Sequence, residues 1–449
     1  MISLSHLRGQ SIGVLGLGAS GLATARALKA AGADVVCWDD TDAARAKASA
    51  EGFVVAQPDM DAITMLVTSP GIPIAYPTPH PIIAEALASQ IDVIGDIELF
   101  AQARAALPKH SVIGITGTNG KSTTTALIGH CLNAAAHSAH IGGNFGPPVL
   151  SLPADGGVYV LELSSFQLEQ TQSLACDVAI FLNLSPDHGD RYASMADYGA
   201  AKQRLFDMQT SEQVAVLALD DEEGRRLAGQ VSGKVTGVSV SGNPDALWQL
   251  KHGALLCGGN PVSKAADWPA LKGPHNAQNA AAAAAACAAL GLSFADIAHG
   301  LETFPGLAHR SQHVGSLGAI AFVNDSKATN PDAAARSLMA YENIHWLAGG
   351  SDKGGDFSVL NDALSNVTRA YFFGQTGPVL KEAVLLEEAA CFETMESAFD
   401  AAVANAKASS EPATVLLSPA CASFDQFRNF AHRGEVFSQL ARGVQQEAA

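Results

Sequence analysis

Several features are scarce in this 449-residue sequence, and each shortage excludes a class of protein. The seven cysteines are scattered without a C-x-x-C pair, which is typical of buried thiols in a reducing compartment rather than of a disulfide framework. Basic residues number 27 against 44 acidic ones, and the net charge of −17 argues against nucleic acid or an anionic membrane as partner. A signal-peptide pattern and a long uncharged apolar run are also lacking, apart from an alanine tract. We therefore expect a soluble, cytoplasmic protein without membrane insertion.

The composition that remains is globular, with 48% hydrophobic and 16% charged residues. The length exceeds what one hydrophobic core supports, so several domains are expected. Apolar strand-like runs alternate with helix-like runs, which predicts an α/β fold with mostly parallel sheets. We place three domains at residues 1–98, 99–306 and 307–449, the first and last Rossmann-like, with a small antiparallel insert at 238–262 in the central one.

The segment VIGITGTNGKSTTT at residues 112–125 has the order of a phosphate-binding loop: an apolar strand, glycines, Lys-Ser, then a helix. Gly117 and Gly120 let backbone N–H groups turn toward an anion at the start of the following helix. Lys121 is placed to reach phosphates and the Ser122 hydroxyl to hold Mg²⁺. Ile115 stands where the strict pattern has glycine, so the loop is a variant. An ordinary glycine turn is the alternative, but the complete order favours an ATP or GTP site.

A second glycine pattern, Gly16-x-Gly18-x-x-Gly21, follows the strand-like run 12–15 near the start of the chain. The next expected strand ends at Asp39, near the distance at which an acid binds a ribose hydroxyl in dinucleotide-binding folds. NAD(P) is the obvious interpretation. The physical argument supports less, namely a diphosphate-bearing nucleotide at this helix start.

Polar residues follow the later strands at the sheet edge where α/β proteins bind ligands. Glu162 ends the run 158–161 beside the phosphate loop, where a Mg²⁺ ligand is expected. Lys202 lies in a helix-like run, and its residue type alone assigns it no role. Polar loops also follow the strands, carrying Asn144, Asp187, His188, Asn324, Asp325, Lys327, Thr329, Lys353, Ser423 and Arg428, and Asn279 lies near the start of the helix-like alanine run.

Taken together, several blocks resemble the Mur ligases, the ATP-dependent amide-forming enzymes of peptidoglycan precursor synthesis. The blocks are GITGTNGKST, ELSSFQLE, the series from Asp187 to Lys202, HNAQNAAAA, AHR at 308–310 and NDSKATN. GLGASG and LLSPACASFDQFRNFAHRG are similar to the branch of the family that adds D-glutamate. In that family the first domain holds UDP, so the resemblance favours a UDP-sugar over NAD there.

The resemblance implies roles for individual residues. For ATP these are Gly117, Thr118, Asn119, Gly120, Lys121, Ser122, Thr123, Asn279, Arg310 and Asp325. For the UDP-sugar they are Gly18, Ser20, Asp39, Ser69, Pro70, Gly71 and Asn144. For the amino acid they are Thr329, Lys353, Ser423 and Phe430, and for two Mg²⁺ sites Ser122, Glu162, His188 and Lys202. Lys202 matches a lysine that the family carries as a carbamate, and Lys121, Glu162, His188, Lys202 and Lys327 match catalytic positions.

The reaction implied is ATP-dependent joining of D-glutamate to UDP-N-acetylmuramoyl-L-alanine through an acyl phosphate, by a monomer. Lys327 and Lys353 independently favour an acidic amino acid, because a neutral one leaves a buried lysine unpaired. The D configuration comes from the resemblance alone. Two alternatives stay open: another ligase of the Mur or folylpolyglutamate type, and an NAD-dependent oxidoreductase fused to an NTPase.

Overall fold

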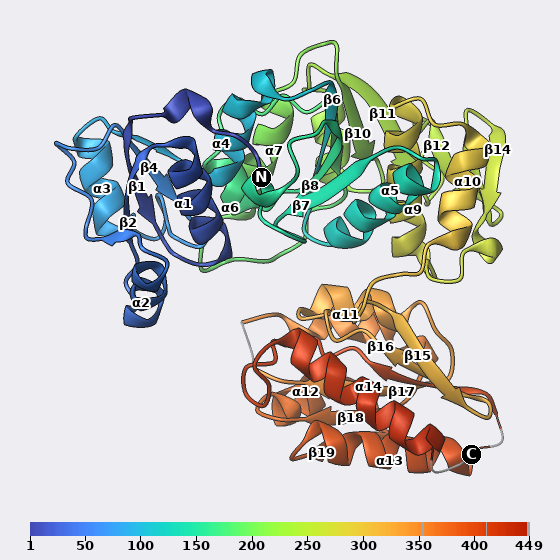
Figure 1. The fold of residues 1–449 in the computed structure, drawn as a ribbon. Helices are drawn as coiled ribbons and strands as arrows, with labels where there is room; N and C mark the ends of the chain where they lie inside the picture. Colours follow the sequence, from blue (N-terminus) through green and yellow to red (C-terminus); the bar gives the residue numbers. More distant parts are fainter. Residues whose placement is uncertain (352–353, 410, 447–449) are drawn as a thin grey trace. The chain divides into compact units, whose positions relative to one another are not determined.

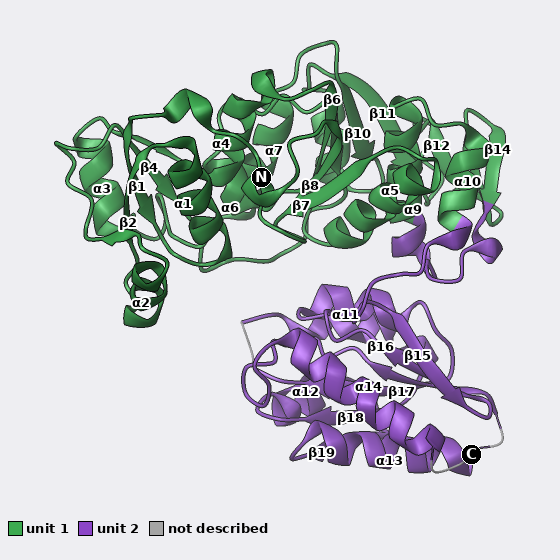
Figure 2. Cartoon of the chain, in the orientation of Figure 1, with its two compact units in different colours: residues 1–263, 278–301 green, residues 264–277, 302–449 purple. Residues whose placement is uncertain are grey.

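The structure is a computed structural model that describes residues 1–351, 354–409 and 411–446. The chain forms two compact units, one of residues 1–263 and 278–301 and one of residues 264–277 and 302–449 (Figure 2). Within the described residues the strands form three sheets, of five, nine and six strands (Figure 1). The α/β class is confirmed. The three domain boundaries stay a prediction, because the first two sheets fall in one unit.

The N-terminal sheet is parallel, in the order β3-β2-β1-β4-β5. Its strands are β1 Ser11–Leu15, β2 Asp34–Trp38, β3 Val54–Val55, β4 Met65–Thr68 and β5 Asp92–Ile94. The helices around it are η1 Ser5–Leu7, α1 Ala19–Ala31, α2 Asp42–Ala50, α3 Pro81–Ala88 and α4 Asp96–Ala103. Ile12 and Val14 belong to the apolar cluster that contains α1, whereas Leu15 packs in the cluster of α3. Both faces are therefore covered, as the continuously apolar strand predicts.

The central sheet has the order β14-β13-β12-β11-β10-β9-β6-β8-β7. Its strands are β6 His110–Thr116, β7 Ala139–Gly143, β8 Gly157–Glu162, β9 Val178–Phe181, β10 Val214–Ala218, β11 Lys234–Ser239, β12 Trp248–Lys251, β13 Ala254–Cys257 and β14 Asn260–Lys264. The helices of this part are η2 Arg104–Ala106, α5 Lys121–Ala134, η3 Val149–Ser151, α6 Ser165–Glu169, α7 Met195–Asp207, α8 Glu222–Ala228, η4 Ala265–Asp267, α9 Pro274–Ala289 and α10 Phe294–Thr303. β12 and β13 pair antiparallel, which confirms the predicted insert.

The C-terminal sheet has the order β15-β16-β20-β17-β18-β19 and is parallel except for the β15–β16 pair. Its strands are β15 Gln312–Leu317, β16 Ile320–Asn324, β17 Ile344–Gly349, β18 Val367–Phe373, β19 Ala389–Phe392 and β20 Ala413–Leu417. Its helices are α11 Pro331–Leu338, η5 Phe357–Asn366, α12 Gly377–Ala383, α13 Met395–Ala408 and α14 Phe430–Gln446. Alternate strand residues enter opposite cores: Trp346 packs with α11 and η5, and its neighbour Leu347 with α13 and α14.

Two helix starts follow ordinary rules of helix termini. α4 begins at Asp96 after the N-cap residue Gly95, so Asp96 and Glu98 both occupy its first turn. Acidic side chains are favoured there by the helix dipole. α9 begins at Pro274, since proline suits the first helical position. No helix in the described ranges has the length and apolar character needed to cross a bilayer.

Candidate active site

The phosphate-binding loop connects β6 to α5, and its backbone requires glycine. Gly117 and Gly120 have φ values of 145° and 87°, which side-chain-bearing residues rarely adopt. A Cβ atom added to Gly120 would lie 2.3 Å from Oδ1 of Asn279 on α9. The glycine therefore also allows α9 to approach the loop, which brings the predicted ATP contact Asn279 to the predicted cradle.

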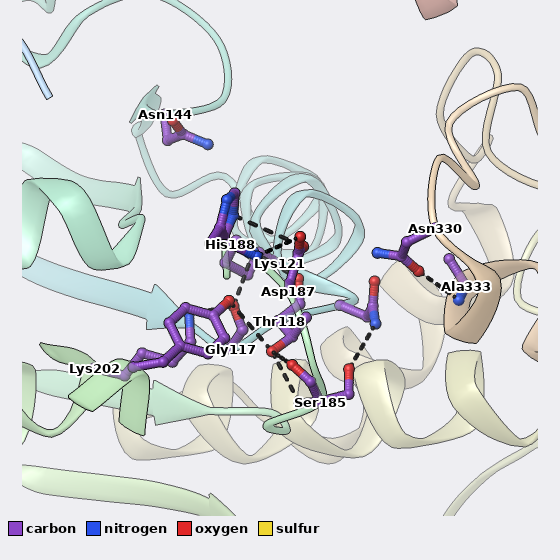
Figure 3. A network of polar contacts seen from close by, with 12 residues as sticks. Gly117, Thr118, Lys121, Asn144, Ser185, Asp187, His188, Lys202, Asn330 and Ala333 are labelled. Carbon is purple, nitrogen blue, oxygen red and sulfur yellow. Dashed lines mark hydrogen bonds and ion pairs between the residues drawn. The ribbon is translucent and has the colours of Figure 1, made fainter. Parts of the chain in front are cut away.

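Two lysines converge on one carbonyl of this loop (Figure 3). Nζ of Lys121 donates to the carbonyl oxygens of Gly117 and Thr118, at 2.8 Å each. Nζ of Lys202 on α7 donates to the same Gly117 oxygen at 2.9 Å. Two ammonium groups so close repel one another, and this arrangement favours a neutral form for one of them.

Lys202 is the more deeply buried of the two lysines. Only 1% of the residue is exposed, and its Nζ lies 4.2 Å from the centre of the Tyr198 ring. Burial, followed by repulsion from Lys121, lowers the pKa of Lys202 well below that of an ordinary lysine. Lys202 is therefore not a solvent-facing lysine, and its free amine is available for chemistry that an ammonium cannot perform.

Glu162 at the end of β8 accepts hydrogen bonds from two other predicted site residues, Ser122 and Asn144. Its Oε2 accepts a 2.5 Å hydrogen bond from Oγ of Ser122, and its Oε1 accepts one of 2.8 Å from Nδ2 of Asn144. Glu162 is 3% exposed, so this carboxylate is held beside the loop without competition from bulk water. The Ser122–Glu162 oxygens are hard ligands of the kind Mg²⁺ prefers, and the residues present fit that ion.

Among the described residues, no group of three or more histidine, cysteine, aspartate and glutamate side chains forms a ready-made metal site. Magnesium in phosphoryl-transfer sites needs no such cage, because one or two protein oxygens, substrate phosphates and water complete its shell. The predicted ligand set of Ser122, Glu162, His188 and Lys202 therefore stays a prediction. The structure brings Ser122 and Glu162 into contact.

His188 lies in the loop after β9 with φ of 54°. Its ring packs edge-on against Phe166 and Tyr198, with centroid distances of 4.8 and 5.9 Å, and its Nε2 lies 3.7 Å from Oδ2 of Asp187. Burial lowers the pKa of His188 despite the opposing effect of Asp187, and the lysines lower it further. His188 is therefore neutral near pH 7 and able to accept a proton or a metal ion.

The N-terminal glycine turn gathers its predicted residues at the edge of the first sheet. A Cβ atom added to Gly21 would lie 1.7 Å from the Gly16 carbonyl oxygen, whereas one added to Gly18 would meet nothing within 4 Å. Oγ of Ser69 donates to the Gly16 carbonyl at 2.8 Å. Gly21 is therefore needed for packing, and Gly18 faces open space where a ligand can approach.

Asp39 is held by the turn itself. Its Oδ2 accepts the Leu17 N–H at 2.7 Å, and its Oδ1 accepts the Thr41 N–H and hydroxyl at 2.9 and 2.7 Å. Burial raises the pKa of Asp39, but these hydrogen bonds and the charge of Arg45 outweigh it, so the pKa lies below the usual value. The acid is therefore ionised and fixed in orientation, as a hydroxyl-binding group requires.

The C-terminal unit assembles its own predicted residues. Oδ1 of Asp325 accepts the Ser311 N–H at 3.0 Å next to Arg310, and burial raises the pKa of Asp325 to about 6. Nζ of Lys327 lies 4.4 Å from the centre of the Phe430 ring. Ser423 is buried, Thr329 is partly buried, and Lys353 lies outside the described residues. Of the residues expected to bind ATP or the amino acid in this unit, Asp325, Lys327 and Thr329 follow β16 and Ser423 follows β20, whereas Arg310 precedes β15 and Phe430 begins α14.

Other organising residues carry no sequence pattern of their own and were missed. Asn183 after β9 accepts the Asn119 N–H at 2.8 Å and donates to the Asn119 carbonyl at 3.1 Å, which fixes the phosphate loop. Arg433 on α14 is fully buried and donates to the carbonyls of Gly349, Cys421 and Ala422 and to Ser326. Each stabilises loop backbone by tertiary contact, which no local pattern displays.

Comparison with known families agrees with this geometry. Residues 115–287 match the Mur ligase middle domain and residues 309–421 match the Mur ligase, glutamate ligase domain. Residues 1–88 match the NAD binding domain of D-isomer specific 2-hydroxyacid dehydrogenase. The last match fits the glycine turn and leaves the identity of its ligand open.

Full-length relatives decide the family. A protein of Sphingopyxis alaskensis is 45% identical over 97% of this chain and 98% of its own length. A protein of Caulobacter vibrioides is 42% identical over 99% and 98%, and one of Ruegeria pomeroyi 44% over 97% and 98%. The chain belongs to the Mur ligase family. All three relatives are named UDP-N-acetylmuramoylalanine–D-glutamate ligase, which confirms the predicted branch.

Solved structures of Mur ligases share the fold. MurF ligase from Thermotoga maritima in complex with ADP superposes with a TM-score of 0.64 at 16% identity, covering 100% of this chain and 98% of that one. MurC from the same organism gives 0.61 at 18% identity, covering 97% and 100%. At such identities the likeness concerns the architecture alone, and this chain shares it with the Mur ligases.

Proposed function

We propose that this Mur ligase joins D-glutamate to UDP-N-acetylmuramoyl-L-alanine, converting ATP to ADP and phosphate, as a step of peptidoglycan precursor synthesis. The observation that carries the proposal is the phosphate cradle with Lys121, Lys202 and the Ser122–Glu162 pair around it, in a chain whose full-length relatives bear that name. We further propose that the enzyme acts as a cytoplasmic monomer without nucleic-acid partners.

The proposed roles follow the three substrates. ATP is bound by Gly117, Thr118, Asn119, Gly120, Lys121, Ser122, Thr123, Asn279, Arg310 and Asp325. The UDP-sugar is bound by Gly18, Ser20, Asp39, Ser69, Pro70, Gly71 and Asn144. The amino acid is bound by Thr329, Lys353, Ser423 and Phe430, and Mg²⁺ at two sites by Ser122, Glu162, His188 and Lys202. Bound magnesium would offset phosphate charge.

The reaction proceeds in two steps, phosphoryl transfer and amide formation. A carboxylate oxygen of the UDP-substrate attacks the γ-phosphorus of ATP, and the bond to the ADP oxygen breaks, which gives an acyl phosphate. The neutral amine of D-glutamate then attacks the acyl carbon, and inorganic phosphate leaves. Lys121 and Lys327 offset charge on the transferring group, and His188 is placed to accept a proton that the amine loses.

The buried Lys202 supports its modification to a carbamate. A free amine adds to carbon dioxide and releases one proton, and the lowered pKa of Lys202 supplies that amine near neutral pH. The product carries a negative charge, which reverses the repulsion with Lys121 and offers oxygen atoms to Mg²⁺. The same burial that makes an ammonium unfavourable thus favours a charge-paired carbamate.

The amino acid is the substrate that the residues define most weakly. Lys327, a cation beside the Phe430 ring, favours an acidic side chain, since each carboxylate can pair with a cation or hydroxyl. A diamino acid would bring a second ammonium toward that lysine. The residues give no information on the hand, and the D configuration rests on the relatives' name.

Phosphate release from ATP with UDP-N-acetylmuramoyl-L-alanine tests the proposal. We expect turnover with D-glutamate and little with L-glutamate, D-aspartate, L-alanine, L-lysine or meso-diaminopimelate. Preference for a neutral or diamino acid would overturn the charge argument. Preference for L-glutamate would overturn the assigned branch only.

A second candidate is favoured by the match of residues 1–88 to an NAD binding domain. In that case the Gly16–Gly21 turn binds NADH, and the chain is an oxidoreductase fused to a nucleotide-hydrolysing domain. Calorimetric titration separates the two. Our proposal expects binding of the UDP-sugar and none of NADH, and tight NADH binding that UDP-sugar displaces would support the oxidoreductase.

A further inference from the structure

Arg191 connects two parts of the substrate site that belong to different sheets. It lies three residues after His188, in the loop that follows β9 of the central sheet, and is 7% exposed. Its Nη1 donates to the carbonyl of Gly71 at 3.2 Å and its Nη2 to that of Ile72 at 2.9 Å, both in the loop that follows β4 of the N-terminal sheet. One guanidinium thus bonds the backbone of the proposed UDP-sugar loop, residues 69–72.

The guanidinium is also fixed from the central side. Its Cζ lies 4.6 Å from the centre of the Phe166 ring, and Nη2 lies 3.5 Å from Oε2 of Glu169. Phe166 packs against the His188 ring as well. The backbone N–H of Arg191 donates to the His188 carbonyl at 2.9 Å, so the His188 loop and the UDP-sugar loop share one rigid contact.

A second polar contact from the central part of the chain to this loop is weaker. Nε2 of Gln170 reaches the Ser69 carbonyl at 3.5 Å, the limit of a hydrogen bond. A charged, forked donor between two carbonyls is stronger and fixes direction, because the planar guanidinium cannot rotate its donors independently. Burying such a charge is costly, so packing alone gives a poor account of an arginine here.

We propose that Arg191 is a positioning residue that sets the UDP-sugar loop 69–72 relative to the phosphoryl-transfer site. This inference rests on the proposed function. The UDP-substrate must be anchored on the N-terminal sheet while its carboxylate reaches the γ-phosphate of ATP on the central sheet. A shift of about 1 Å between reacting groups can reduce a rate about 10²-fold, so a fixed link between the two loops matters for catalysis.

The test compares Arg191→Ala with Arg104→Ala. Arg104 is a matched control: it is half-buried in the same unit, donates to the Ala175 carbonyl and pairs with Asp177 at 3.1 Å, and its hydrogen bonds in the described part of the chain go to His110, Ala175 and Asp177 rather than to loop 69–72. For Arg191→Ala we expect the KM for the UDP-substrate to rise about 10-fold and kcat to fall, with the KM for ATP nearly unchanged. Arg104→Ala should leave the ratio of the two KM values as in the wild type.

Added guanidinium ion, at concentrations well below denaturing, should restore part of the Arg191→Ala activity, whereas sodium chloride at equal ionic strength should not. Arg191→Lys should fall between wild type and alanine, because an ammonium keeps the positive charge but lacks the planar, forked donors that hold the two carbonyls in a fixed direction. If the alanine variant does not fold, the lysine variant carries the same comparison of KM values.

Equal changes in both KM values, or loss of folded protein with normal kinetics in the remainder, would mean that Arg191 is only structural. Failure of the wild-type enzyme to use the UDP-substrate would overturn the proposed function instead. The two failures are therefore distinguished by the wild-type assay in the same experiment.

Discussion

The molecule contains two glycine turns that look alike in sequence and behave differently in structure. Both follow a buried parallel strand and lead into a helix, β1 to α1 at Gly16–Gly21 and β6 to α5 at Gly117–Lys121. Both use positive φ angles, 86° at Gly16 and 87° at Gly120. Each helix start thereby offers backbone N–H groups to an anion.

The difference lies in the side chains that neighbouring strands bring to each turn. The second turn receives Lys202 from α7 and Glu162 from β8, in addition to its own Lys121. The first turn is contacted by Asp39 and Ser69, which hold its backbone. A turn beside a lysine ammonium and a carboxylate can promote phosphoryl transfer, whereas one fixed only by hydrogen bonds can bind and orient a ligand. Because these side chains come from distant parts of the chain, a glycine pattern alone does not tell which nucleotide a turn binds.

The largest expected effect on activity comes from removing the ammonium group of the second turn. Lys121→Ala deletes the ammonium that the loop aims at developing phosphoryl charge, and losses of about 10²-fold or more in kcat are expected for such contacts. Single-turnover phosphate release measures the effect, and circular dichroism checks the fold. A folded variant with near-normal activity would contradict the assignment of this turn to ATP.

Lys202→Ala should be nearly as severe and, unlike Lys121→Ala, partly restored by small carboxylic acids. A carbamate contributes an anionic oxygen pair that an added acid can imitate. Full activity of the variant without additives would exclude the modification.

The wild-type enzyme provides a pH test of the same lysine. Because burial lowers the pKa of Lys202, its neutral amine exists at pH values where an ordinary lysine, with a pKa near 10.5, is protonated. Enzyme freed of carbon dioxide should regain activity when bicarbonate is added at neutral pH. The gain should disappear as acidification through the lowered pKa protonates the amine.

The first turn is tested by a matched pair of glycines. Gly21→Ala places a methyl group against the Gly16 carbonyl and should destabilise the N-terminal sheet by about 1–3 kcal/mol. Gly18→Ala meets no protein atom and should change stability by less than about 0.5 kcal/mol while weakening UDP-sugar binding. Denaturant unfolding and calorimetry measure the two effects. Equal stability losses would mean that Gly18 also packs against protein rather than facing a ligand.

These expectations show what the sequence could and could not predict. The strands, the loop at 112–125 and the antiparallel insert follow from local patterns, because periodicity and glycine placement act over a few residues. The burial of Lys202, the candidate for carbamate formation, could not be predicted from the neighbouring residues in the sequence. It comes from packing of α7 against the phosphate-binding loop. Arg191, Asn183 and Arg433 were missed for the same reason, because each hydrogen-bonds backbone more than 60 residues away in the sequence.

The last prediction concerns a buried acid beneath the first turn. Asp96 is buried beside Ser20, Thr24 and Ser69, and among the described residues neither carboxylate oxygen has a hydrogen bond of normal geometry. Desolvation raises the pKa of Asp96 to about 6, although the Ser20 hydroxyl and the Ile97 amide lower it slightly. At the second turn, by contrast, the buried carboxylate of Glu162 accepts hydrogen bonds from Ser122 and Asn144.

The sign of the pH effect follows from this pKa. The folded value of about 6 lies above the ordinary 3.8, so the folded protein binds more protons between these values and loses stability as pH rises through 6. A shift of about two units in the pKa corresponds to about 3 kcal/mol in the free energy of unfolding. Asp96→Asn removes the titrating carboxyl group. The free energy of unfolding of this variant, relative to wild type, should therefore increase by up to about 3 kcal/mol from pH 4 to pH 8. Asp61→Asn, the same substitution at an exposed position, is the control. A flat difference for Asp96→Asn would mean that the carboxylate stays ionised and solvated, and the two turns would then be alike in how they hold their acids.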